Sequence, residues 1–341
     1  MKIGIINFNP KNLFVFDANS NMNTTDSSGI AAEFKTYYDE RLIRKTGPNL
    51  VFAQFATKKP LPAGKGKTIE FRGFKDLDTT AKNYKLTEGV TPDASKLEMY
   101  TLTATVAQYG NYVIITDMVE TTAIDPMVTE CVDILASQAE IVLDKLIRNA
   151  ILADEEVAQH YARDVDDTEE LTVEGHKISV ADIRKIVAYL KRVNAPKIEG
   201  AYPLILHTDV ASDLTADEEY KELYKYLKPE TLASGYVGDV AGARIYESTN
   251  AMITTNEAGN VAIYHCHLVA QGAYGCVNLK GGGLRTIIKQ VGSSGVADAL
   301  DQRGSIGWKA ASATRVLVPN YLITYSCTSS LNCVEDAETV A

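Results

Sequence analysis

The sequence lacks any long run of apolar residues. Its first residues include a lysine and a few apolar side chains, but Asn7, Asn9 and Pro10 interrupt them before a signal-peptide core can form. No later stretch approaches the roughly 20 apolar residues that a membrane helix needs. We therefore expect no signal peptide, no transmembrane segment and no membrane partner, and we expect the protein to be made in the cytoplasm.

Positive charge is also scarce. The 341 residues include 34 Lys and Arg against 44 Asp and Glu, for a net charge of −10, whereas a protein that binds nucleic acid tightly through its phosphates is usually basic. The cysteines form no CxxC pair and no disulfide framework, so we expect free thiols in a reducing compartment. They are Cys131, Cys266, Cys276, Cys327 and Cys333.

Catalytic and cofactor motifs are missing as well, since no GxSxG, HExxH or GxGxxG is present. Gly66-Lys67-Thr68 resembles the end of a phosphate-binding loop, but Leu61 stands where its first glycine belongs and the residues that follow alternate like a strand. The acidic run that begins at Asp164 lacks the glycine and the final glutamate of a calcium loop. We expect no catalytic residue, no cofactor and no metal.

His265 and His267 form the one close histidine pair. On a strand both imidazoles would point to the same face and could supply two metal ligands, but the sequence identifies no third. We therefore expect two polar residues on the solvent face of a half-buried strand. A cytosolic oligomeric enzyme that uses this pair is kept as an alternative.

The most regular feature is a helix predicted from Asp125 to about Leu152, with Asp125 as N-cap and Pro126 at the first helical position. An apolar stripe is expected to face the core. Polar residues occupy the opposite face, which we expect to be in solvent, with Asp144 and Arg148 spaced for an ion pair. The stripe is Val128, Val132, Leu135, Ala139, Val142, Leu146 and Ala150; the polar face is Glu130, Asp133, Ser137, Glu140, Asp144 and Arg148.

Residues 60–105 have the pattern of a long two-stranded ribbon. Ile69 and Phe71 alternate with polar residues at one edge, residues 97–104 alternate at the other, and the middle is rich in turn residues. An isolated ribbon has too little core to be stable alone. That difficulty disappears if the ribbon lies on a neighbouring subunit, so the sequence itself favours a self-assembling protein.

The remaining segments indicate mixed α and β structure. We expect a polar N-terminal arm, a short helix over 31–46, and a strand pair over 106–120. A compact domain over 178–280 should contain a helix capped by Ser179 and another opened by a Thr215–Glu218 capping box. Strands return after a Gly281–Gly283 hinge, and the acidic C-terminal residues should fray. Trp308 is expected to be a core or interface anchor.

Several stretches, taken in order, strongly resemble the major capsid proteins of tailed bacteriophages, and most closely the N-four-type coliphage family. The resemblance extends from about Phe34 to Tyr325. The matching stretches are YYDERLIRKTGPNLVFAQF, KGKTIEFRGF, LTEGVTP, ATVAQYGNYVIITDMVETTAIDP, LILHTDVASDL and ALDQRGSIGWKAA.

The resemblance implies the α+β tailed-phage capsid fold, which is also found in herpesvirus capsid floors and encapsulin shells. Its parts would be an N-arm, an extended β-hairpin loop, a peripheral domain with a long spine helix, and an axial domain. The implied segments are 1–30 N-arm, 31–59 helix and connector, 60–105 extended loop, 106–177 and 281–330 peripheral domain, 178–280 axial domain, and 331–341 C-terminal tail.

The implied function is a non-enzymatic shell protein that forms the pentamers and hexamers of an icosahedral head. Its partners would be further copies of itself, the portal, scaffolding and decoration proteins of the phage, and packaged double-stranded DNA held by weak contacts. It would be assembled in the bacterial cytoplasm and found in the virion. An encapsulin-like compartment is the alternative. The implied subunit contacts are Lys67, Glu70, Arg72, Asp301, Gln302, Arg303 and Trp308.

Overall fold

The structure is a computed structural model that describes residues 51–62, 66–77, 79, 84, 86, 88–91, 94–118, 127–224, 238–279, 283–291, 293 and 302–338. The expected N-terminal arm, the short helix over 31–46, the Asp125–Pro126 cap and the Gly281–Gly283 hinge include residues outside these ranges. Among the described residues, no helix combines the length and apolar character needed to cross a bilayer.

The long helix is confirmed as α4, Met127–Leu152. By contacts the chain divides into two units, and three continuous elements, α4, β4 (Ala107–Thr116) and β13 (Arg303–Val316), contribute to both. One unit contains Gly110–Ala139 and Leu284–Ala310, and the other contains the rest of the described chain. This division is based on residue contacts and does not correspond to the functional segments that the resemblance implies. The boundaries of those segments therefore stay a prediction.

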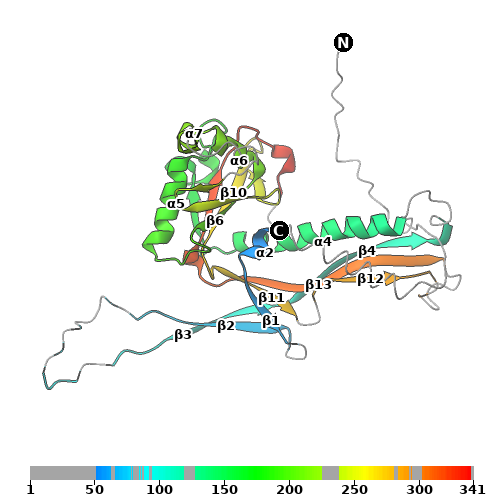
Figure 1. Ribbon diagram of the computed structural model, residues 1–341, viewed down its shortest axis with the longest axis horizontal. Coiled ribbons are helices and arrows are strands. Elements are labelled where there is room, and N and C mark those ends of the chain that lie inside the picture. Colours follow the sequence, from blue (N-terminus) through cyan, green and yellow to red (C-terminus); the bar gives the residue numbers. More distant parts are fainter. Residues whose placement is uncertain are drawn as a thin grey trace, which may run out of the picture. The chain divides into compact units, whose positions relative to one another are not determined.

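In the larger unit, a seven-stranded sheet has the order β5-β14-β10-β6-β8-β7, and β9 pairs with β10. Three helices, α5, α6 and α7, belong to the same region as β6 and β10 (Figure 1). The strands are β5 Ala158–Tyr161, β6 Tyr202–Leu206, β7 Asp239–Val240, β8 Ala243–Glu247, β9 Met252–Thr255, β10 Ala262–Val269 and β14 Leu322–Cys327; the helices are α5 Val180–Arg192, α6 Thr208–Ala216 and α7 Glu218–Tyr224.

The core of this sheet lies between β6, β10, β14 and the apolar face of α5. Ile183 and Leu190 of α5 are fully buried in one cluster with Leu204 and Leu268 of the sheet. Ser179 caps α5, as predicted, because its side-chain oxygen accepts the Asp182 N–H. The predicted strand Tyr202–Leu206 is buried at every position, which is the pattern of a central strand covered on both faces.

Two local predictions for this chain are wrong. Thr215 does not open a helix with Glu218, because it lies inside α6; Asp217 precedes α7 and accepts the Glu219 N–H instead. Residues 106–120 were also expected to form two strands, but one strand, β4, continues through Gly110 without a turn. Gly110 allows the backbone of β4 to approach the backbone of β13 closely, because a Cβ at this position would lie 2.5 Å from the Trp308 carbonyl oxygen.

The larger unit also holds a second β-region. Strand β1 (Thr57–Leu61) pairs in parallel with β11 (Tyr274–Leu279), and β11 pairs antiparallel with the C-terminal half of β13. The predicted ribbon is confirmed: β2 (Thr68–Phe74) and β3 (Met99–Thr105) pair antiparallel from Thr68↔Thr105 to Phe74↔Met99 (Figure 1). The short helix α2 (Val51–Gln54) precedes β1.

In the smaller unit, β12 (Arg285–Lys289) pairs antiparallel with the N-terminal half of β13. Trp308 pairs with Thr286 across these strands and is buried, with 3% of its surface exposed. Its indole N–H donates to Gln138 of α4 at 3.2 Å, and Gln138 also accepts the Asn111 side-chain amide at 3.0 Å. Trp308 therefore connects β13, α4 and β4 within this unit.

Candidate functional site

The base of the ribbon is held by a small apolar cluster that contains Phe71. Phe71 is buried against Leu61, Ala104 and Val277, and the Lys59 ammonium lies 5.0 Å from the centre of its ring. Two strands alone would bury too little to stay ordered. The contact between Phe71 and β11 therefore attaches the ribbon to the rest of its own chain.

Beyond Phe71 the ribbon exposes large apolar side chains. Phe74 and Met99 face each other across the two strands and are 62% and 54% exposed. Exposed apolar residues of this size are normal when scattered, whereas two that face each other favour a contact. We call Phe74 and Met99, together with the exposed apolar residues of the segment that joins β2 to β3, the ribbon apolar surface. The residues of that segment are Leu77, Tyr84, Leu86, Val90 and Leu97.

The sequence indicates this surface only in part. The segment has few large apolar residues, and their scarcity predicts that the ribbon needs support from outside. The alternation of residues does not show that the large apolar side chains beyond Phe71 are exposed. Exposure depends on which other segments cover the ribbon, and these lie far away in the sequence.

Three predicted contact residues lie on β2 or next to it, and all three are exposed. Glu70 and Arg72 point to the same face, where the guanidinium and carboxylate are 3.1 Å apart. Further along, Lys75 pairs with Glu98 of the opposite edge at 3.0 Å. Such exposed pairs contribute under about 1 kcal/mol, so Glu70 and Arg72 can exchange partners at little energetic cost. The third residue is Lys67.

The other predicted contact residues lie at the start of β13 in the smaller unit. Gln302 and Arg303 are exposed, and the Gln302 carbonyl accepts the Asp117 N–H at 3.3 Å. Asp301 lies outside the described residues. Trp308 differs from the rest, because it is buried within its own protomer and is not part of the exposed surface.

The histidine pair does not lie on a solvent face, which corrects the expectation from the sequence. Strand β10 is buried at nearly every position. Both ring nitrogens of His265 are hydrogen-bonded, to Thr254 and Ser326 at 2.9 Å each, and His267 bonds Thr324 at 3.3 Å. Burial, with Arg148 nearby, lowers the pKa of His265 to about 4. Burial, with His265 and Arg148 nearby, lowers the pKa of His267 to about 3.

These histidines are therefore neutral core residues rather than two metal ligands on an exposed face. No group of three His, Cys, Asp or Glu side chains suited to a metal occurs in the part of the chain that the structure describes. The five cysteines are free thiols, as predicted. Burial raises the pKa of Cys131, Cys276 and Cys333, which lowers their reactivity.

The polar face of α4 is expected in solvent, and this expectation is wrong for the C-terminal half of the helix, although Glu130 near its start is exposed. Asp144 and Arg148 are each 1% exposed, and Glu140 is buried too. Asp144 accepts the Phe52 N–H at 3.0 Å and the Asn250 amide at 3.2 Å. Arg148 bonds Glu338 at 2.6 Å rather than serving as the expected solvent-exposed partner of Asp144. Two apolar residues of α4, Ile134 and Ile141, are exposed instead.

The C-terminal residues up to Glu338 do not fray, which is a further correction. Glu338 contacts both Lys145 and Arg148, and its N–H donates to the Ile253 carbonyl at 2.8 Å. Burial alone would raise the pKa of the Glu338 carboxyl, but hydrogen bonds from the two cations outweigh burial and lower it. This carboxylate therefore stays ionised.

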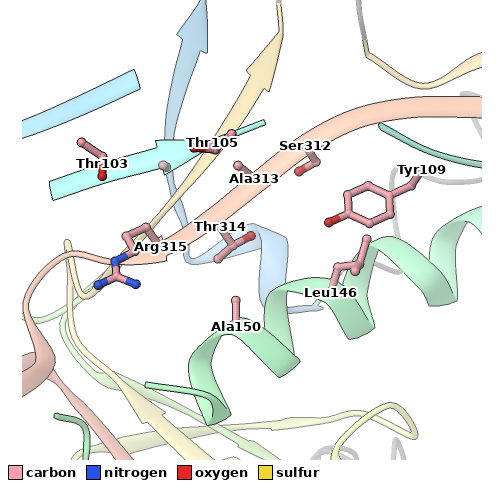
Figure 2. Close-up of a pocket in the computed structure, with 10 residues that line it drawn as sticks. Thr103, Thr105, Tyr109, Leu146, Ala150, Ser312, Ala313, Thr314 and Arg315 are labelled. Carbon is pink, nitrogen blue, oxygen red and sulfur yellow. The ribbon is translucent and has the colours of Figure 1, made fainter. Parts of the chain in front are cut away.

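A hollow of about 270 Å³ lies in the larger unit between β3, the C-terminal half of α4 and the C-terminal half of β13 (Figure 2). Its lining contains small hydroxyl and methyl side chains, together with Tyr109 and Arg315. It contains no carboxylate, histidine or thiol among the described residues, so it offers no acid–base pair or activated nucleophile. The lining residues are Thr103, Ala104, Thr105, Tyr109, Leu146, Ala150, Ser312, Ala313, Thr314 and Arg315.

A comparison of the sequence with protein-family models and with curated proteins finds no match. Solved structures do match. The capsid structure of Helicobacter pylori bacteriophage KHP30 aligns with a TM-score of 0.61 at 14% identity, over 96% of this chain and 100% of that chain. The head structure of Helicobacter pylori bacteriophage KHP40 aligns with a TM-score of 0.62 at 14% identity, over 97% and 99%.

The capsid of Ralstonia phage GP4 aligns with a TM-score of 0.61 at 11% identity, over 81% of this chain and 87% of that chain. Identities this low establish a shared fold and nothing finer. The agreement nevertheless spans most of each chain. The chain therefore has the α+β fold of bacteriophage major capsid proteins, as its sequence predicts.

Proposed function

We propose that this chain is the major capsid protein of a tailed bacteriophage and forms pentamers and hexamers of an icosahedral head around double-stranded DNA. The observation that carries the proposal is the ribbon apolar surface. A single protomer leaves Phe74 and Met99 in water, and a second copy would bury them. Burying one such side chain contributes about 1.5–3 kcal/mol.

The segments would act as the resemblance implies: 60–105 as the extended loop over a neighbour, 106–177 and 281–330 as the peripheral domain, and 178–280 as the axial domain. One chain can occupy pentamers and hexamers if a flexible contact absorbs the difference in angle. A ribbon attached at its base through Phe71 suits that role. The ordered sequence stretches also support membership of the N-four-type coliphage family.

The net charge of −10 fits a container for DNA better than a DNA-binding protein, since packaged DNA must move past the wall. We infer portal, scaffolding and decoration proteins as further partners, assembly in the bacterial cytoplasm, and residence in the virion. The role is structural rather than catalytic, and with His265 and His267 buried and hydrogen-bonded, the enzyme alternative loses its basis.

Negative-stain electron microscopy of the purified, concentrated protein tests the proposal directly. Uniform closed shells of tens of nanometres are expected, whereas dimers or small rings at every concentration would contradict it. An encapsulin-like compartment would also form shells, but these would contain a co-purifying protein. Mass spectrometry of the shell contents distinguishes the two kinds of shell.

Replacing Phe74 by aspartate should prevent assembly without unfolding the protomer. The substitution removes a buried contact and places a charge in the same interface, and each 1.4 kcal/mol lost changes an association constant about tenfold. We expect the protein concentration at which shells form to rise at least about tenfold in sedimentation velocity. Phe74→Leu should assemble normally, and unchanged assembly of Phe74→Asp would rule out this surface as a contact.

Charge reversal at Arg72 and at Arg303 should each weaken assembly, because both arginines are proposed to face acidic groups of a neighbour. Arg72→Glu also creates a repulsive pair with Glu70. The double swap Glu70→Arg with Arg72→Glu restores that local pair and serves as the control. Light scattering should show weak assembly for both Arg72 variants; recovery in the swap would mean that only the local pair matters.

A further inference from the structure

Arg148 of α4 is buried although it carries a permanent charge. Its side chain is 1% exposed, and its donors reach the Asn250 carbonyl at 2.7 Å and the Asn149 side-chain oxygen at 2.9 and 3.1 Å. Burying a guanidinium is unfavourable unless its hydrogen bonds and its charge are both satisfied. These neutral acceptors satisfy part of its hydrogen-bonding capacity, and its charge requires an anion.

The directly bonded anion comes from the far end of the chain. The Glu338 carboxylate bonds Arg148 at 2.6 Å, and its second oxygen contacts the Lys145 ammonium. Lys145 and Arg148 are three residues apart, so one turn of α4 presents both cations on one side. Two cations on one helical turn, one of them fully buried, form a binding site for a carboxylate.

The other contacts of the segment that carries Glu338 are neutral. The Asn332 side-chain amide donates to the Asn260 carbonyl at 3.1 Å, and the Cys333 N–H donates to the Tyr264 hydroxyl at 3.2 Å. Its short 3-10 turn, Val334–Asp336, contributes no buried residue, although Val334 and Ala337 pack partly against the core of the larger unit. The Glu338 N–H bonds the Ile253 carbonyl of β9, and Asn332 accepts the Ala262 N–H at 2.8 Å. The charged contact at Glu338 is therefore the strongest single attachment of this segment.

We propose that Lys145 and Arg148 form a carboxylate-binding site that the chain fills with its own Glu338, so that residues 332–338 act as a latch on the C-terminal half of α4. With the latch closed, the buried guanidinium is neutralised and this half of the helix is rigid. With the latch open, the site binds a small carboxylate from solution. The proposal concerns one protomer and stands independently of the proposed function.

The test is hydrogen exchange of the unassembled full-length chain carrying Glu338→Ala. Hydrogen bonds to charged groups contribute about 1.5–3 kcal/mol, which corresponds to about a tenfold to hundredfold change. We expect the backbone amides of Val334, Ala337 and position 338 to lose protection by that factor. The backbone amides of α4 near Arg148 should lose less protection than these, and the protection of the α5 amides should not change.

Sodium acetate should restore the lost protection in the α4 amides of Glu338→Ala, because acetate can occupy the vacated site. Sodium chloride at the same ionic strength should not. Equal effects of the two salts would mean screening rather than binding and would overturn the proposal, as would unchanged protection in the variant.

The matched control is Glu335→Ala, which removes an exposed carboxylate from the same short turn. It should leave exchange unchanged with or without acetate. If Glu338→Ala fails to fold, the double variant Arg148→Met with Glu338→Ala keeps the proposal testable, because it removes both charges together. The double variant should fold and should not respond to acetate; failure to fold would show that charge neutralisation is not the role of Glu338.

Discussion

Replacing Trp308 by alanine is expected to lower the free energy of unfolding of the unassembled protein by about 3–5 kcal/mol, the range for a large buried aromatic side chain. The indole is buried, bonds Gln138 through its N–H, and lies on a strand that approaches β4 closely. A Cβ at Gly110 would lie 2.5 Å from the Trp308 carbonyl oxygen, so β4 has no room to move inward and fill the space. The cavity should therefore persist.

Urea denaturation followed by circular dichroism measures this change, since Trp308 is the sole tryptophan and its fluorescence disappears with the substitution. Trp308→Phe is the control and should recover much of the loss, because it keeps part of the ring volume although it lacks the N–H donor. The sequence alone also allows Trp308 to be a subunit contact. Normal stability combined with failed assembly would favour that role over a core residue.

Acid is expected to destabilise the protomer through His265 and His267, starting below pH 6.5. Their pKa values are about 4 and about 3 in the folded protein, against 6.5 for an ordinary histidine. The unfolded chain therefore binds more protons than the folded chain between these values, so stability is full above pH 6.5 and falls as the pH decreases. Between pH 7 and pH 4.5 the two imidazoles should remove on the order of 4 kcal/mol.

The groups around the imidazoles explain why they resist protonation. Arg148 of α4 lies close enough to disfavour a second positive charge, and Phe52 packs edge-on to the His267 ring at 5.7 Å between centroids. The hydroxyls around the two rings hydrogen-bond a neutral imidazole. The hydroxyls belong to Thr254, Thr324 and Ser326.

Comparison with His267→Gln isolates the histidine contribution from the carboxyl groups. Urea denaturation at pH 7 and at pH 4.5 should show a loss of stability that is smaller by about 2 kcal/mol in the variant. An identical pH dependence for His267→Gln and the unchanged protein would mean that His267 already binds a proton in the folded state.

Local patterns in the sequence are sufficient for many of the elements themselves. The apolar period of α4, the Ser179 cap and the alternation around Phe71 each depend on residues a few positions apart, and each is confirmed. The Thr215 cap is wrong for a local reason too, because the preceding helix continues through it. Only one residue separates the two helices, and the sequence there contains no glycine or proline to show where the first helix ends.

The environment of the polar face of α4 could not be predicted from the sequence. Asp144 is bonded to Phe52 and Asn250, which are 92 and 106 residues away, and Arg148 is bonded to Glu338, 190 residues away. A helical period shows that these side chains share a face but not what covers it. The same limit explains β10, because the side chains that enclose His267, such as Phe52 of α2, come from distant parts of the chain.

The attachment of the ribbon by its base, through the apolar cluster around Phe71, has a consequence for the accuracy of assembly in the proposed shell. A contact made by a ribbon that is anchored mainly at its base loses conformational freedom on docking, so its net strength is smaller than its apolar area suggests. Subunits that arrive in a wrong orientation would then dissociate before the next subunit fixes them. Many such contacts, each weak, would still make the closed shell stable, because a subunit inside it must break several at once.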